Sequence, residues 1–265
     1  MAEINLAQRY GPWAVVAGGS EGLGAAFAHR LAAQGMKLLL IARKPEPLEA
    51  VAAEVREQHG AEVRTLALDL TTAEAFATIA EATAGCELGL LVYNAGADSH
   101  VKNFLDRPMQ ELERLIALNV LMPTKLVRHF TPAMVERRRG GVILLSSFAS
   151  AAGTPGNLLY AATKAFSNIF AEGLWYELGE HGVDVLGLIV GIVRTPAMER
   201  MGYTFEGLTI AADPHDLVDE ALQNIDKGPT LHAGGTYDDV YRLRTLPRDE
   251  AVRSIAAFSK AAQAT

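Results

Sequence analysis

Seven short apolar runs, separated by longer segments with helical periodicity, constrain the fold of this 265-residue chain more than any other feature. The runs cover residues 13–17, 37–42, 63–68, 88–93, 141–147, 183–190 and 229–233. The helical segments cover residues 22–34, 46–59, 72–83, 109–137, 157–180, 214–226 and 248–263. Runs that are apolar at nearly every position indicate strands buried on both faces, and intervening helices supply the crossovers of parallel pairing. The sequence therefore predicts an α/β fold, a doubly wound parallel sheet of about seven strands with helices on both faces.

The chain has no internal repeat and no linker rich in proline, glycine or serine, so residues 1–265 are expected to form a single domain. Its formal net charge of -7 disfavours broad attraction to nucleic acid or to an anionic membrane surface. The one basic run, Arg137 to Arg139, is expected at the C-terminal end of a helix, where cations meet the negative end of the dipole. We therefore expect neither nucleic acid nor a membrane as a partner.

A single cysteine, Cys86, excludes an intramolecular disulfide and fits a reducing compartment. The N-terminal residues lack the basic start and apolar stretch of a signal peptide, and no apolar run approaches the ~18 residues of a membrane helix. These features predict a cytoplasmic protein. The seven histidines show no His-x-x-x-His or Cys/His ligand spacing, so no metal site is expected.

A glycine-rich turn joins the first predicted strand to the first predicted helix, with the spacing Gly18-x-x-x-Gly22-x-Gly24. Glycines at such a turn let backbone N–H groups at the helix N-terminus approach a pyrophosphate. The pattern alone is also explained by a tight turn without a ligand, and methyltransferases bind a nucleotide at a similar turn. A phosphate-binding loop of the Gly-Lys-Ser/Thr type is excluded because those residues are missing.

The segment from 144 to 166 contains a candidate catalytic group. Tyr160 and Lys164 are four residues apart in a predicted helix, so they lie on one face. A neighbouring ammonium favours the phenolate, and we expect Lys164 to lower the pKa of Tyr160 toward neutral pH. Ser147, at the end of the fifth strand, is placed to donate a hydrogen bond to a carbonyl oxygen that gains negative charge, with Ser146 as the alternative.

Together these residues resemble the short-chain dehydrogenase/reductase family, and the similarity extends over nearly the whole chain. The motifs that carry it are Gly18-Gly19-Ser20-Glu21-Gly22-Leu23-Gly24, Asn94-Ala95-Gly96, Asn119, Ser147, Tyr160 and Lys164. The resemblance implies a Rossmann-type fold and a catalytic tetrad of Asn119, Ser147, Tyr160 and Lys164. It also implies a set of NAD(P)-binding residues: Gly18, Ser20, Glu21, Gly22, Leu23, Gly24, Arg43, Asp69, Leu70, Asn94, Ala95, Gly96, Tyr160, Lys164, Gly191, Val193 and Thr195.

Three positions depart from the family pattern. Ala17 replaces the usual threonine before the first glycine, and Tyr93 replaces the first asparagine of Asn-Asn-Ala-Gly. Val190 replaces the usual proline before Gly191, which removes a preset φ where the sixth strand ends. None of the three belongs to the tetrad.

The end of the second strand bears on the choice of coenzyme. NAD enzymes of this fold usually place an acid there to hold the adenosine ribose, whereas this chain has Ala42 followed by Arg43. An arginine offers a planar, permanently charged fork to a 2′-phosphate, so NADP(H) is favoured over NAD(H). Glu21 opposes this preference, because NADP enzymes of the family often have a basic residue at its position. We expect the Glu21 side chain to turn to solvent, as an acid tolerated at a helix N-terminus.

The resemblance implies an oxidoreductase that interconverts a carbonyl and a secondary alcohol, with Tyr160 as general acid and base and a fairly apolar substrate. The residues from 195 to 212 form the substrate lid in this family, with Met198, Met201, Tyr203, Phe205 and Leu208 as candidate pocket residues. His100 is either a substrate contact or an exposed loop residue.

Two other functions remain open. One is a redox-silent dinucleotide-binding regulator, which has no use for a full tetrad. The other is an epimerase or dehydratase with a recycled coenzyme, whose larger C-terminal region has little room here. The family commonly pairs two helices between subunits, and the helix at 157–180 is apolar over much of its surface, so a homodimer or homotetramer is expected.

Overall fold

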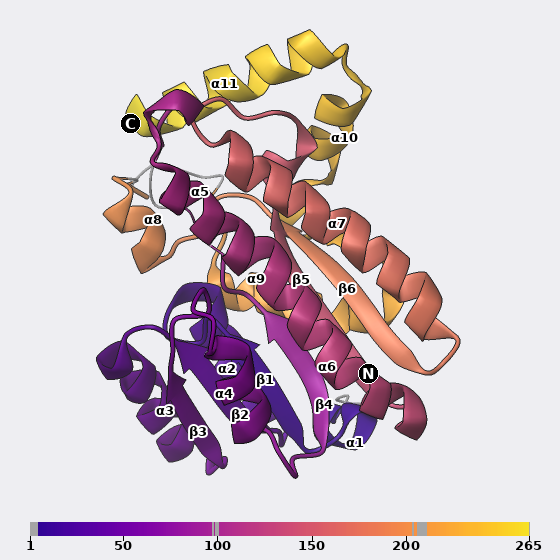
Figure 1. Ribbon diagram of the computed structural model, residues 1–265. Coiled ribbons are helices and arrows are strands. Elements are labelled where there is room, and N and C mark those ends of the chain that lie inside the picture. Colours follow the sequence, from indigo (N-terminus) through magenta and orange to yellow (C-terminus); the bar gives the residue numbers. More distant parts are fainter. Residues whose placement is uncertain (1–4, 97, 99–100, 203, 206–210, 265) are drawn as a thin grey trace.

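The computed structural model describes residues 5–96, 98, 101–202, 204–205 and 211–264. Its seven strands form one sheet in the order β3-β2-β1-β4-β5-β6-β7, and all neighbouring strands are parallel (Figure 1). The strands are β1 (Trp13–Ala17), β2 (Lys37–Ala42), β3 (Val63–Ala67), β4 (Leu88–Tyr93), β5 (Gly140–Ser147), β6 (Val183–Val190) and β7 (Thr230–His232). The predicted doubly wound parallel sheet is confirmed.

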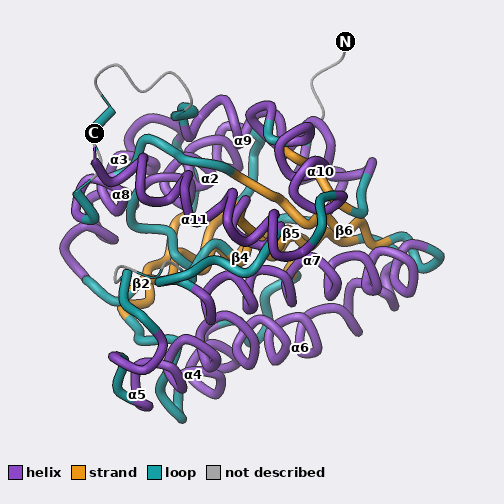
Figure 2. The backbone as a smooth tube through the Cα atoms, turned by 90° about the horizontal axis from the view of Figure 1, so that it is seen from above, coloured by secondary structure: helices purple, strands orange, loops and turns teal. Residues whose placement is uncertain are grey.

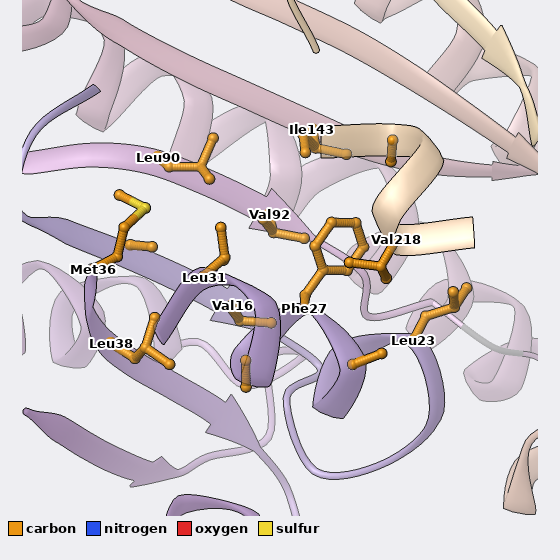
Figure 3. Close-up of a cluster of buried hydrophobic side chains, with 14 of the residues drawn as sticks. Val16, Leu23, Phe27, Leu31, Met36, Leu38, Leu90, Val92, Ile143 and Val218 are labelled. Carbon is orange, nitrogen blue, oxygen red and sulfur yellow. The ribbon is translucent and has the colours of Figure 1, made fainter. Parts of the chain in front are cut away.

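Helices cover both faces of the sheet (Figure 2). One layer contains α2 (Gly22–Ala33), α3 (Pro45–His59) and α9 (Pro214–Asn224), and the other contains α4 (Ala75–Ala82), α6 (Met122–Arg137) and α7 (Leu158–Gly179). Successive strand residues point to opposite faces, so Val16 packs against the first layer and Val15 against the second. In Figure 3, Phe27 of α2 lies against Val92 and Val218, and it is fully buried.

The long helix expected at 109–137 is interrupted. The structure has α5 (Met109–Ile116), a π-helical segment (Ala117–Leu121) and then α6. Pro123 lies in the first turn of α6, where its missing N–H is tolerated, and it follows directly on the π-helical segment.

Three helices lie outside the predicted set: α1 (Leu6–Tyr10), α8 (Pro196–Arg200) and α10 (Tyr237–Thr245). The first two span five residues each, too few to show helical periodicity. α10 and α11 (Arg248–Ala264) pack with Val240, Leu243 and Ile255 against Ala151 and Ala152. These C-terminal helices therefore cover the loop that follows β5.

Other expectations are met in the described part of the chain. The basic run lies at the end of α6, where Arg138 is the C-cap with φ 50°. Cys86 is partly buried beside the core and accepts a hydrogen bond from Arg64 at 3.5 Å. None of the described helices combines the length and the apolar character that a membrane span needs.

Candidate active site

The glycine turn packs tightly at the carboxyl edge of the sheet. Gly18 has φ +87°, a conformation that side chains disfavour, and its N–H donates to the carbonyl of Ile41 at 2.7 Å. The Asn94 side chain donates to the carbonyl of Gly18 at 2.8 Å. A Cβ on Gly24 would lie 1.8 Å from that same carbonyl, so no side chain fits at the start of α2. The turn thus has the backbone cradle that a dinucleotide pyrophosphate requires.

The segment after β6 touches this turn. Thr195 caps α8 by accepting a hydrogen bond from the Met198 N–H at 3.3 Å, and a Cβ on Gly22 would lie 2.7 Å from its methyl carbon. One residue earlier in the turn, Glu21 forms a two-pronged ion pair with Arg200 of α8, with one oxygen 3.0 Å from a guanidinium nitrogen. The Glu21 side chain is 36% exposed, as expected, but it is not free in solvent, because a distant helix supplies an arginine that pairs with it.

Asn119 lies in the π-helical segment and is 2% exposed. Its amide donates to the hydroxyl of Thr163 at 3.1 Å, while its oxygen is buried without a hydrogen-bond partner. Next to it, the hydroxyl of Tyr93 donates to the carbonyl of Leu118 at 2.5 Å. The tyrosine that departs from the family pattern thus ties β4 to the segment that carries Asn119.

Ser146 and Ser147 are adjacent but have different partners, because neighbouring strand residues point to opposite sides. Ser146 is buried and donates to the backbone carbonyl of Lys164 at 2.8 Å. Ser147 ends β5 and accepts from the Ala149 N–H at 3.2 Å, and its hydroxyl acts on the Tyr160 phenol so as to lower the pKa of that group. The geometry therefore pairs Ser147, and not Ser146, with the tyrosine.

Tyr160 lies in the first turn of α7, and its pKa is raised. Burial is the main cause, since it penalises the phenolate, and the hydrogen bond from Ser147 opposes the effect. The charge of Asp98 raises the pKa further. The expected lowering by Lys164 is not seen in this structure: Lys164 is not among the groups that shift the pKa of Tyr160, and burial sets the direction.

Lys164 is itself buried, and desolvation lowers its pKa to about 8. Its ammonium donates to the carbonyl of Leu145 at 3.0 Å and lies 5.6 Å from the centre of the Tyr160 ring. Gly96 faces it from the loop after β4: a Cβ there would lie 3.0 Å from the ammonium nitrogen and 2.1 Å from the Asn119 oxygen. Asn119, Lys164 and Gly96 therefore meet at one point, next to the tyrosine.

Sequence reasoning missed an ion pair beside this group. Asp98 and Arg107 approach to 2.7 Å with side chains only 6% and 5% exposed, and Glu111 lies 3.8 Å from the same guanidinium. Asp98 and Arg107 are nine positions apart on a loop, so no helix or strand spacing predicts their contact. Their opposite charges are the one signal that the sequence gives. The pair ties Asp98 to Arg107, which lies just before α5.

The remaining predicted coenzyme residues lie along the same edge of the sheet. Arg43 is exposed just after β2, and Val193 forms a bridge with Ala212. Asp69 is already engaged: burial would raise its pKa, but hydrogen bonds from Thr71 and Arg114 lower it. The other members of the set follow the same strands: Ser20 and Leu23 after β1, Leu70 after β3, Ala95 after β4 and Gly191 after β6.

The predicted lid is only partly within the described residues. Met198 lies in α8, and Met201 and Phe205 follow it with partly buried side chains. Tyr203 and Leu208 lie outside the described residues, as does His100.

Comparisons with known proteins agree with this geometry. A family model described as short chain dehydrogenase matches residues 12–204. A 7beta-hydroxysteroid dehydrogenase of Collinsella aerofaciens is 31% identical over 261 residues, which is 96% of this chain and 99% of that protein. A very-long-chain 3-oxoacyl-CoA reductase of Bos taurus is 36% identical over 196 residues, but the match spans only 63% of the reductase.

Solved structures give the same result. One from a study of 7beta-hydroxysteroid dehydrogenase stereoselectivity has a TM-score of 0.89 and 31% identity, covering 95% of this chain and 99% of that one. A short-chain dehydrogenase from Sphingobium yanoikuyae in complex with NADPH has a TM-score of 0.77 and 30% identity, covering 88% and 93%. The chain belongs to the short-chain dehydrogenase family and is an NAD(P)-dependent oxidoreductase that interconverts a carbonyl and a secondary alcohol.

Proposed function

We propose that this protein reduces a bulky, apolar ketone with NADPH and uses Tyr160 as the proton donor. The observation that carries the proposal is the cluster of Ser147, Tyr160 and Lys164, in which the serine hydroxyl acts to lower the pKa of the tyrosine and the lysine ammonium lies 5.6 Å from the centre of its ring.

Each member of the tetrad has a role in this mechanism. The nicotinamide coenzyme, when bound, supplies or accepts the hydride. Ser147 donates a hydrogen bond to the carbonyl oxygen as negative charge develops on it, and Tyr160 gives that oxygen its proton. Lys164 places a positive charge beside Tyr160 and binds the nicotinamide ribose, while Asn119 ties the π-helical segment to α7 through its hydrogen bond to Thr163. In alcohol oxidation the tyrosine acts as the base.

The coenzyme is NADP(H) in this proposal. Arg43 supports NADP(H), because its side chain is exposed beside the glycine turn. Position 42, where NAD enzymes of this fold usually have an acid, is an alanine. The family neighbour solved with NADPH is consistent with it. The pyrophosphate lies on the turn formed by Gly18, Gly22 and Gly24, and the nicotinamide end lies near Val193 and Thr195.

Apolar side chains around the tyrosine support an apolar substrate. Phe148 follows Ser147 and packs against Phe258 of α11 with ring centres 5.5 Å apart. Leu158 is 47% exposed at the start of α7, and Val101 is 45% exposed beside Gly156. A full-length relative is named a hydroxysteroid dehydrogenase, so steroid ketones are the first class to test.

We also propose a homodimer or homotetramer in the cytoplasm. The outer face of α7 carries Ile169, Trp175 and Tyr176, which are 69%, 40% and 71% exposed. Such a row of large apolar side chains fits a subunit contact. Light scattering at micromolar concentration tests it, and a stable monomer would contradict it. The single, partly buried Cys86 fits the reducing compartment.

The decisive experiment follows absorbance at the nicotinamide band with NADPH and NADH and a panel of carbonyls from small keto esters to steroid ketones. We expect turnover with NADPH and bulky ketones, and a lower NADPH preference in Arg43→Ala. Coenzyme binding without turnover of any ketone would indicate a regulator. Product formation without net change of the coenzyme would indicate an epimerase or dehydratase.

A further inference from the structure

The ion pair between Glu21 and Arg200 joins two parts of the chain that are 179 residues apart. Glu21 is the N-cap residue of α2, yet its carboxylate caps no N–H of that helix. Instead both of its oxygens bind the guanidinium of Arg200. Two parallel contacts of this kind are the strongest geometry for an arginine and a carboxylate.

The position of Glu21 makes this pair relevant to coenzyme choice. A pyrophosphate at the N-terminus of α2 lies next to Glu21. The N–H groups of Gly18 and Gly19 bond to the carbonyl of Ile41, so the turn also adjoins the end of β2, where the adenosine ribose is expected. An uncompensated carboxylate there would repel a coenzyme with a 2′-phosphate more strongly than one without it.

We propose that Arg200 is a specificity-determining residue, which neutralises Glu21 so that the dinucleotide turn accepts a phosphorylated coenzyme. It acts through Glu21 and is therefore a positioning residue that touches no reacting atom. The contact between Thr195 and Gly22 keeps α8 on the turn, within reach of Glu21. This inference rests on the proposed dinucleotide site. It concerns how Arg200→Gln changes the ratio of the NADPH and NADH affinities, whichever of the two coenzymes the parent prefers.

The test measures dissociation constants for NADPH and NADH by fluorescence titration of the full chain. We expect Arg200→Gln to weaken NADPH binding about fivefold, the upper end for a partly exposed ion pair, while NADH binding changes less than about twofold. Arg200→Lys should retain most of the preference, and the double variant Glu21→Gln with Arg200→Gln should regain it. The loss should shrink at about 0.5 M salt, because screening weakens the exposed Glu21 charge. Arg128→Gln, on the exposed face of α6, controls for loss of one positive charge.

Two results would overturn the proposal. An equal loss of affinity for NADPH and NADH in Arg200→Gln would mean that the ion pair only holds α8 in place. If the double variant bound NADPH as weakly as Arg200→Gln does, Arg200 would act without Glu21. A parent protein that prefers NADH would instead contradict the proposed NADPH preference, while a further fall of the ratio in Arg200→Gln would still support the role of Arg200.

Discussion

Replacing each of the two adjacent serines by alanine separates a catalytic role from a structural one. Ser146→Ala removes a buried hydrogen bond of 2.8 Å to the carbonyl of Lys164, and Ser147→Ala removes one of 3.2 Å from the Ala149 N–H. Each loss costs about 1 kcal/mol of unfolding free energy. In a chain of this size, that corresponds to a fall in Tm of about 2–4 °C. The two variants should therefore unfold at similar temperatures.

Their activities should differ widely. Ser147 is the serine whose hydroxyl acts on Tyr160, so its loss removes one donor to the developing oxyanion. One such donor is worth about 10²–10³-fold in kcat, or roughly 2.7–4 kcal/mol. Ser146→Ala should lower kcat less than about tenfold, because its hydroxyl points to the backbone of α7.

The assay combines kcat at 25 °C, with saturating NADPH and a ketone that the parent reduces, with Tm from thermal unfolding. Both variants remain folded at that temperature, so stability does not confound the rate. A larger loss of kcat in Ser146→Ala than in Ser147→Ala would refute the reasoning and move the oxyanion role to Ser146.

Three further outcomes are expected. Tyr160→Phe should lower kcat by about 10²–10⁴-fold with little change in coenzyme affinity, whereas Lys164→Ala should lower both kcat and coenzyme affinity. Near-normal turnover in Tyr160→Phe would exclude Tyr160 as the acid. The pKa of Lys164 is about 8 in the folded protein and 10.5 ordinarily, so between pH 8 and pH 10 the unfolded chain binds more protons than the folded one. The unfolding free energy should therefore rise by about 2 kcal/mol from pH 8 to pH 10. Denaturant titrations should show this rise in the parent and not in Lys164→Met; a rise in both would place its cause elsewhere. Gly24→Ala should abolish coenzyme binding and lower Tm, since its Cβ would lie 1.8 Å from the Gly18 carbonyl. Gly179→Ala, with open space around it, should leave coenzyme binding and Tm unchanged. Normal coenzyme binding and Tm in Gly24→Ala would contradict the tight packing of the turn.

Local pattern was sufficient for the sheet and for much of the site. A strand buried on both faces is apolar throughout, so β1 and β4 stand out as apolar runs of sequence, whereas β3 and β7 are only partly buried and have weaker runs. The spacing of Tyr160 and Lys164 follows from helix geometry, and the glycines follow from backbone conformation. The π-helical segment at Asn119 has no such local signal, because Pro132 lacks the same backbone bond and yet lies inside a continuous α6.

What the sequence could not supply are interactions between residues far apart in it. The choice between Ser146 and Ser147 depended on which side of β5 faces α7, and the sign of the Tyr160 pKa shift depended on burial against several elements. The partner of Glu21 lies 179 residues away on a five-residue helix. Periodicity and spacing report only on neighbours along the chain, whereas burial and charge pairing are set by the tertiary packing that brings distant elements together.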